Sequence, residues 1–302
     1  MTDSPSTRPK WFRIALVLVP LWLFASGGAA LWYYFHREKK QAHIEQARFT
    51  QSISIPVLAD DLKKIVSLIG ERNTSSEIAA QNLSSTAAMI EGMLGPTNTG
   101  YAVKKIKGPR EWPLLQVTLK SKKPDAPAIW IVSSFDSKPG SPGAEANATG
   151  LASTMAAAQQ LAGSTFDVDL HFVFIPHAND PESPIVETAA KLKEIAPLPK
   201  AILCVEAMGG GSELWLSSRE TNALPLGLTK GLGSVHGSEV VCLGDDFDLS
   251  STLFEMGFPA VRVATRPILT AAEPDDKIPS AEILAASTGR LVELIRRCAS
   301  LK

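Results

Sequence analysis

The feature that most constrains the fold is an alternation of short apolar runs and helix-length segments from about residue 129 onward. Several runs are continuously apolar, which is typical of strands that helices cover on both faces. This alternation favours an α/β sandwich with a mostly parallel sheet. The expected strands are Tyr101–Ile106, Leu114–Leu119, Ile129–Ser134, Leu170–Ile175, Ala201–Glu206, Leu214–Ser217, Glu239–Leu243 and Ala260–Val263. The expected helices are Ile55–Gly70, Thr74–Leu94, Ala148–Ala162, Pro184–Ile195, Leu224–Leu232, Leu249–Met256 and Ala281–Ala299.

The N-terminal segment Ile14–Phe35 is almost uncharged and long enough to cross a hydrocarbon core of about 30 Å as a helix. Trp32, Tyr33 and Tyr34 fall where an interfacial aromatic belt is expected. A cleaved signal peptide is the alternative, but the apolar run is long for one. Bulky aromatic and charged residues, rather than a small-x-small site, follow it. We therefore expect an uncleaved transmembrane helix.

Basic residues flank this segment equally, so the positive-inside rule does not orient it. Three precede the span and three follow it: Arg8, Lys10 and Arg13, then Arg37, Lys39 and Lys40. A short tail before the span and a large domain after it favour a cytoplasmic N-terminus and an extracytoplasmic domain. The expected organisation is a tail at 1–13, a transmembrane helix at 14–35, a stalk at 36–54 and an α/β domain at 55–302.

Composition excludes some classes of function. Thirty Lys and Arg face 31 Asp and Glu, for a net charge of −1, so the chain carries no basic footprint for nucleic acid. Cys204, Cys242 and Cys298 are too few and too scattered for a disulfide framework or a zinc knuckle. We expect them to be small buried hydrophobes, while a single disulfide stays open.

Two linked motifs carry a family resemblance. Residues 129–137 read I-W-I-V-S-S-F-D-S, and residues 143–150 read G-A-E-A-N-A-T-G. They resemble the di-zinc aminopeptidase and carboxypeptidase family, whose members have H-x-D at the strand end and G-A-N-D-N-x-S-G at the helix start. The resemblance extends from about Thr74 to the C-terminus. It implies a three-layer α/β sandwich with a mixed, mostly parallel sheet, and its kin include leucyl aminopeptidase, glutamate carboxypeptidase, transferrin receptor and nicastrin.

The same resemblance assigns the positions of a zinc pair and its general base. Such a centre needs imidazole nitrogens and carboxylate oxygens, with a basic carboxylate beside the metal-bound water. Here Ser134 stands at a ligand His, Ala146 at the bridging Asp, and Ala178 and Asn179 at the paired glutamates. The last ligand His falls near Leu269, where the chain has no His. Only Glu206, at an Asp ligand, is a conservative exchange, and Asp136 matches the Asp that orients the first His.

The resemblance therefore implies a vestigial cleft without confident catalytic residues or metal ligands. Its residues are Ser134, Asp136, Ala146, Asn147, His177, Asn179 and Glu206. We expect no cofactor and a membrane-anchored binding or scaffold module with a protein or peptide partner. The alternative is an active membrane-bound metallo-aminopeptidase or carboxypeptidase. In it, zinc would be held by Glu206, Asp136, His177 and nearby acids such as Glu145.

Two replacement sites are less favoured. A hydrolase triad would combine Ser134 or Ser137 with His177 and Asp136 or Asp180, but the chain has no G-x-S-x-G elbow. A calcium site would draw on acidic residues whose spacing fits no calcium loop. These acids are Asp245, Asp246, Asp248, Glu145 and Glu206. A polar rim and a solvated acidic loop are the simpler interpretations.

Overall fold

A computed structural model describes residues 18–37, 53–179, 185–195, 199–218, 229–237, 249–267, 275 and 277–300. The chain forms two compact units, Met1–Arg48 and Phe49–Lys302. In the first unit, the helix Leu18–Arg37 has 20 residues, a mean hydropathy of 1.3 and no buried side chain. It is long and apolar enough to span a membrane, as a signal sequence near an N-terminus also is. Most of the predicted stalk, at residues 38–52, lies outside the described residues.

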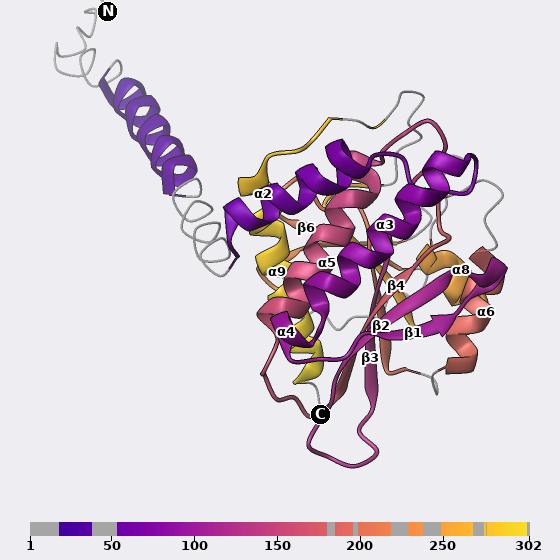
Figure 1. The fold of residues 1–302 in the computed structure, drawn as a ribbon. Helices are drawn as coiled ribbons and strands as arrows, with labels where there is room; N and C mark the ends of the chain where they lie inside the picture. The colour runs from indigo at the N-terminus through magenta and orange to yellow at the C-terminus, as the bar shows by residue number, and fades with distance from the viewer. Residues whose placement is uncertain are drawn as a thin grey trace, which may run out of the picture. The chain divides into compact units, whose positions relative to one another are not determined.

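The second unit is built on one eight-stranded sheet in the order β1-β2-β4-β3-β5-β8-β6-β7 (Figure 1). Strands β3, β4, β5 and β8 run parallel to one another, and β1–β2, β2–β4 and β6–β8 are antiparallel pairs. The sheet is therefore mixed with a parallel centre, as the sequence predicts. The strands are β1 Lys104–Lys107, β2 Pro113–Leu119, β3 Ala128–Ser134, β4 Asp169–Ile175, β5 Ala201–Val205, β6 Leu214–Ser218, β7 Gly233–Gly237 and β8 Ala260–Ala264.

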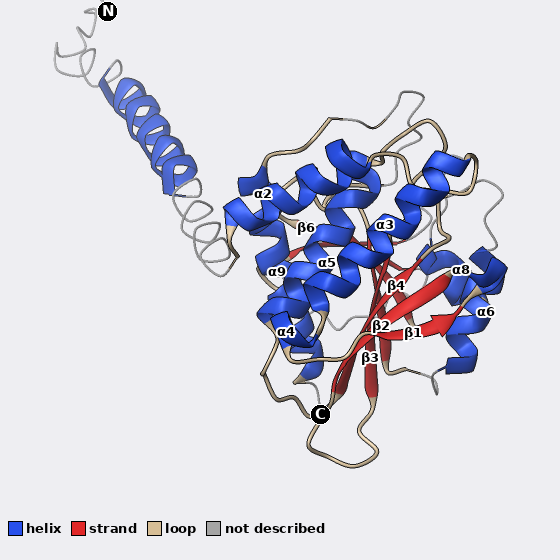
Figure 2. Cartoon of the chain, in the orientation of Figure 1, coloured by secondary structure: helices blue, strands red, loops and turns tan. Residues whose placement is uncertain are grey.

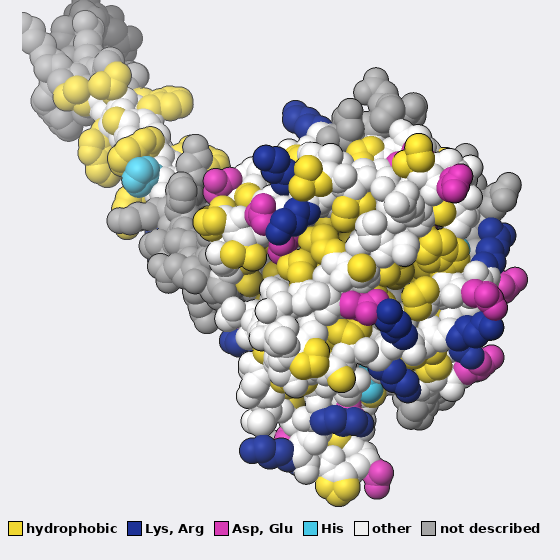
Figure 3. Space-filling view, in the orientation of Figure 1, with side chains coloured by type: hydrophobic (Ala, Val, Ile, Leu, Met, Phe, Trp, Pro, Cys, Tyr) yellow, Lys and Arg dark blue, Asp and Glu magenta, His cyan; other side chains and the backbone are white. Residues whose placement is uncertain are grey.

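Helices cover both faces of this sheet and make a three-layer sandwich (Figure 2). One layer contains α2 Ile55–Lys63 with its π-helical continuation η1 Lys64–Ile69, α3 Glu77–Leu94, α5 Thr149–Gln160 and α9 Ala281–Ala299. The other contains α6 Ile185–Ile195 and α8 Leu249–Glu255. Three short elements complete the described helices: α4 Pro96–Thr99, the 3-10 turn η2 Pro109–Glu111 and the π-helical turn η3 Ala144–Ala148. On the face in Figure 3, basic and acidic side chains are interspersed.

The core divides into two clusters because successive side chains of a strand point to opposite faces. In β3, Ile129 and Ile131 pack with the larger helical layer, whereas Trp130 and Val132 pack with α6 and α8. All four are at most 1% exposed. This double burial explains why the central strands are continuously apolar in sequence.

The parallel strands bring their carboxyl ends to one edge of the sheet, where α/β proteins place their ligands. Gly150 lets the start of α5 lie against this edge, since a Cβ there would be 2.3 Å from the carbonyl oxygen of Glu206. A Cβ on Gly209 would likewise be 2.5 Å from the Cγ atom of Pro279. Close backbone packing therefore fixes the helix start beside the strand ends.

Some predicted elements differ from the structure. Helix α3 begins at Glu77 rather than Thr74, because the Ser76 hydroxyl accepts from the Ala79 N–H at 3.1 Å and caps it there. Strand β1 begins at Lys104 rather than Tyr101. The glycine-rich strand β7 was not predicted, since glycine lowers strand propensity. The predicted strand Glu239–Leu243, and the first five residues of the predicted helix Leu224–Leu232, lie outside the described residues.

Candidate functional site

The cleft begins at Asp136, which follows β3 and is fully buried. Its carboxylate accepts from the main-chain N–H groups of Ala178 and Asn179 at 2.8–3.1 Å. These hydrogen bonds hold the turn after β4 against the end of β3. Asp136 is therefore a structural acceptor here.

Ser134, at the position of a ligand His, lies among amide groups. Its Oγ accepts from Asn147 Nδ2 at 2.6 Å and from Asn179 Nδ2 at 3.0 Å. Asn147 lies in η3, the turn that leads into α5, so this cluster joins the ends of β3 and β4 to the start of the helix. The hydroxyl's acceptor capacity is used by these two neutral donors.

A buried arginine supports this cluster from behind. Arg72 is 0% exposed and donates from Nη2 to Asn147 Oδ1 at 2.7 Å and from Nε to the Phe135 carbonyl at 3.0 Å. Burial lowers the pKa of Arg72 to about 10, and the charge of Asp136 partly opposes that shift. The guanidinium therefore stays charged at neutral pH and supplies a fixed cation under the cleft.

Glu206, at the end of β5, is bound to a second arginine. Arg262 Nε on β8 donates to Glu206 Oε2 at 2.6 Å, and Arg262 Nη1 donates to the Arg266 carbonyl at 2.9 Å. The side chain of Arg262 is 2% exposed and that of Glu206 20%. The acid that matches a zinc ligand is thus half of a largely buried ion pair.

Glu145, the other acid beside the bridging position, has a third arginine. Arg266 Nε donates to Glu145 Oε2, with both side chains partly buried. Burial raises the pKa of Glu145, and Arg266 opposes that shift. Asp275 caps the same turn by accepting from the N–H groups of Glu145 and Ala146 at 2.7–3.0 Å.

These donors do not fit a pair of zinc ions. Zinc sites use imidazole, thiolate or carboxylate ligands, whereas Ser134, Ala146 and Asn179 offer none of them. Glu206 and Glu145, which the resemblance places at and beside ligand positions, already neutralise a guanidinium. Within the described ranges, no group of three or more His, Cys, Asp or Glu side chains could hold a metal ion. The position near Leu269 lies outside those ranges.

The structure joins four predicted cleft residues in one network: Ser134, Asp136, Asn147 and Asn179. Glu206 belongs to a separate pair, Ala146 is exposed, and His177 is fully buried. The hydrogen bonds of Ser137 do not support the triad hypothesis, because its hydroxyl accepts from the Arg72 N–H and donates to the Ser141 carbonyl. The remaining acids proposed for a triad or calcium site, Asp180, Asp245, Asp246 and Asp248, lie outside the described residues.

Sequence reasoning missed the arginines of this site and the Asp275 cap. A local signal existed for one of them, since Arg262 interrupts the apolar strand A-V-R-V-A. A charged residue in a strand covered on both faces is rarely buried without a partner. Arg72, Arg266 and Asp275 lie in loops, where no periodicity marks a buried role.

Comparison with known proteins agrees with this architecture. The model of Peptidase family M28 matches residues 115–177, from β2 to the turn after β4. A Legionella pneumophila LapA aminopeptidase is 17% identical with a TM-score of 0.65, covering 86% of this chain and 75% of that one. The chain has the fold of the M28 zinc peptidases.

Two further structures share this M28-like fold. A Bacteroides thetaiotaomicron leucine aminopeptidase precursor has a TM-score of 0.61 at 10% identity, covering 81% of this chain and 97% of its own. A Tannerella forsythia glutaminyl cyclase has a TM-score of 0.60 at 11% identity, covering 81% and 98%. A search of curated proteins found no match. At these identities the likeness concerns the fold, so function depends on the site itself.

Proposed function

We propose that this protein is a membrane-anchored, catalytically inactive M28-like module that binds a protein or peptide partner. The observation that carries the proposal is the ion pair between Glu206 and Arg262. Glu206 is the one conservative exchange among the predicted ligand positions, and its carboxylate already neutralises a guanidinium at 2.6 Å.

Zinc would have to displace this guanidinium before it could bind Glu206. Arginine does not lose its proton in proteins, so the displaced Arg262 would remain as a buried cation beside another cation. Leaving one partner of a buried ion pair uncompensated is strongly destabilising. The pair therefore opposes metal binding by competing for the ligand and by repelling the ion.

The chemistry of the remaining cleft residues also favours inactivity. Asn179 stands at one of the two positions where the zinc peptidases place the paired glutamates, and a carboxamide is no general base at neutral pH. Its Nδ2 donates to Ser134 Oγ at 3.0 Å, so it serves the internal network. These polar groups maintain the strand-end architecture, on whose surface a partner would bind.

The test uses the full-length protein purified in non-ionic detergent, beside the Glu206→Ala variant and an active zinc aminopeptidase. Metal content is measured after dialysis against zinc, and hydrolysis is followed with aminoacyl p-nitroanilides. We expect no stoichiometric zinc and no zinc-dependent hydrolysis in either form. Stoichiometric zinc that is lost in Glu206→Ala, with hydrolysis lost in parallel, would support the alternative of an active metallopeptidase.

Membrane anchoring through the helix Leu18–Arg37 is tested separately. We expect the full chain to stay in the membrane pellet after an alkaline carbonate wash and to keep its original N-terminus. A variant without residues 1–37 should enter the soluble fraction. A mature N-terminus downstream of Arg37 would instead identify a cleaved signal peptide. Protease protection in sealed vesicles then assigns the side of the domain.

A further inference from the structure

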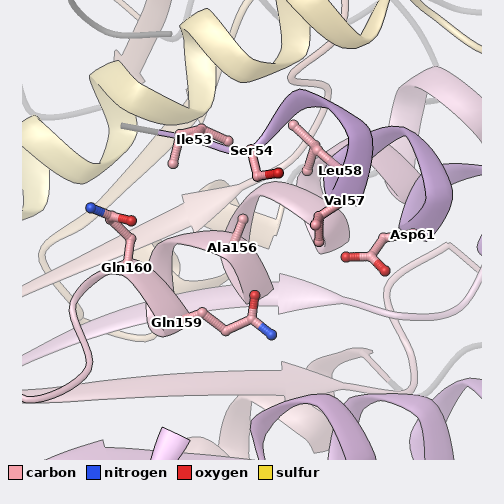
Figure 4. Close-up of a pocket in the computed structure, with 8 residues that line it drawn as sticks. All are labelled: Ile53, Ser54, Val57, Leu58, Asp61, Ala156, Gln159 and Gln160. Carbon is pink, nitrogen blue, oxygen red and sulfur yellow. The ribbon is translucent and has the colours of Figure 1, made fainter. Parts of the chain in front are cut away.

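A second site lies away from the cleft, at the other end of α5. A pocket of about 260 Å³ opens between the first turns of α2 and the last turn of α5 (Figure 4). Its lining residues are Ile53, Ser54, Val57, Leu58, Asp61, Ala156, Gln159 and Gln160. Twelve residues of α5 separate this end from the cleft, a length of about 16 Å at the rise of an α-helix.

The pocket has apolar walls and one charged group. Ile53 and Leu58 are buried and Val57 is 51% exposed, so aliphatic surface lies at both its base and its mouth. Asp61 is only 5% exposed, and Figure 4 shows its carboxylate turned toward the side of Ala156 and Gln159. Among the described residues, no hydrogen bond or ion pair neutralises this carboxylate. The neighbouring Lys64 is paired with Asp60 at 2.6 Å.

The charge distribution of the pocket favours a cationic ligand. Burial raises the pKa of Asp61 to about 6, which Lys64 partly opposes and Asp60 reinforces. The carboxylate is therefore mainly ionised at pH 7.5, although it is poorly hydrated. The amide nitrogen of Gln159 donates to the Met93 carbonyl at 3.2 Å, and the amide oxygen lies on the pocket side in Figure 4. The Asp61 carboxylate and the Gln159 oxygen are thus two acceptors at this pocket, which Ser54 and Gln160 also line.

The helices packed around α2 define which other charges matter. Helix α5, the opposite wall, has no ionisable side chain. Helix α9 also packs on α2, and its charged residues are Glu282, Arg290, Glu293, Arg296 and Arg297. The charges that shift the pKa of Asp61 are those of Lys64 and Asp60. Asp61 is therefore the group whose ionisation governs this pocket.

We propose that the pocket binds a small organic cation, a primary ammonium group on a short aliphatic chain. The ammonium would donate to the Asp61 carboxylate and the Gln159 oxygen, while the chain lies against Val57, Leu58 and Ala156. The volume is below the usual range of about 300–1,000 Å³ for drug-sized ligands, so the ligand is about the size of one side chain. This site is independent of the cleft and of the proposed function there.

The experiment titrates butylammonium chloride into the full-length protein in non-ionic detergent at pH 7.5, with binding followed by calorimetry. Asp61→Asn keeps the side-chain shape but removes the charge. Glu111→Gln is the control, because Glu111 is an acid with a side chain 81% exposed that pairs with Lys107 and does not act on Asp61. We expect wild type and Glu111→Gln to bind equally, and Asp61→Asn to bind at least about tenfold more weakly.

Two measurements on the wild type keep the proposal testable even if Asp61→Asn is unstable. Butanol, which has the same chain without the charge, should bind at least about tenfold more weakly than butylammonium. Butylammonium affinity should fall as pH is lowered from 7.5 to 5, since a primary amine stays protonated throughout while Asp61 does not. Equal binding of the alcohol, a flat pH profile, or equal affinity of Asp61→Asn would each overturn the proposal.

Discussion

Replacing Arg262 with Met is the sharpest test of the proposal that an arginine, and not a metal ion, neutralises Glu206. Arg262 is 2% exposed, and its loss removes a guanidinium from the Glu206 carboxylate, itself 20% exposed. Removing one member of a buried pair costs about 3–5 kcal/mol. Because Glu206 keeps some contact with solvent, we expect the lower end, about 3 kcal/mol. At about 2–4 °C per kcal/mol, the unfolding midpoint falls by about 6–12 °C.

The assay is thermal unfolding of the full-length protein in non-ionic detergent, followed by tryptophan fluorescence. Glu206→Gln and the double variant complete a double-mutant cycle. The free energy of unfolding of the double variant should exceed that of Arg262→Met by on the order of 2 kcal/mol, because the double variant has neither charge of the pair. Lys107→Met is the control, since it breaks an exposed pair with Glu111 and should cause no measurable change.

A midpoint for Arg262→Met within about 2 °C of wild type would refute this reasoning, since about 3 kcal/mol cannot produce so small a shift. Added zinc should not restore the lost stability. Even with Glu206 released from Arg262, Ser134, Ala146 and Asn179 supply no further ligands. Recovery with zinc would mean that a competent metal site lies beneath the ion pair.

Three further comparisons of variants test separate parts of the structure by chemical denaturation. Gly150→Ala should lower the free energy of unfolding by about 1–3 kcal/mol, because its Cβ would be 2.3 Å from the Glu206 carbonyl oxygen. Gly92→Ala, in α3 with open space around its Cβ, should raise it by about 0.5–1 kcal/mol. The opposite order of stabilities would contradict the packing of α5 on β5. Asp275→Ala should cost about 1 kcal/mol through loss of its acceptor for the Glu145 and Ala146 N–H groups, and Asp275→Asn should cost less because its amide oxygen can still accept; no loss of stability in Asp275→Ala would show that the cap does not matter. Asp61, whose pKa burial raises to about 6, binds its proton more tightly when folded, so its share of stability is present below about pH 4 and is lost as pH rises through 6. Asp61→Asn should therefore be more stable than wild type at pH 7.5, on the order of 1 kcal/mol, and similar to it at pH 4; a gain that does not depend on pH would exclude this cause.

The sequence predicted most of the sheet because its signal is local. Strands β3, β4 and β5 are buried on both faces, so each is a continuous apolar run between loops. Helix α9 has the bounds that the sequence predicts, and in the structure Ser280 caps its start by accepting from the Ile283 N–H. Strand β7 failed for the converse reason. It lies at the edge of the sheet and pairs with β6 through a glycine-rich segment that has little apolar character.

The site divides in the same way. The sequence alone assigns the ligand positions, because Ser134, Ala146, Asn179 and Glu206 each fall in a short motif that resembles the family's. The arginines that lie beside these residues could not be predicted in this way. Arg72 is 75 residues from Asn147 in sequence, and Arg262 is 56 from Glu206, so only the fold brings these groups together. Pairing across such distances leaves no pattern in a single sequence.

Charge balance explains how this edge of the sheet holds its acids. Among the described residues there, three acids each interact with an arginine. Glu206 pairs with Arg262, Glu145 pairs with Arg266, and Asp136 interacts electrostatically with Arg72. Buried carboxylates need such compensation, which a peptidase of this fold draws in part from its ions.

An arginine differs from a metal ion because it cannot dissociate. The stability of this edge should therefore not depend on metal supply, and excess EDTA should leave the unfolding midpoint of the wild type unchanged. The stability that a bound ion provides falls when free ion is removed. A midpoint lowered by EDTA and restored by zinc, but not by calcium, would show that an ion and not the three guanidinium groups balances these acids.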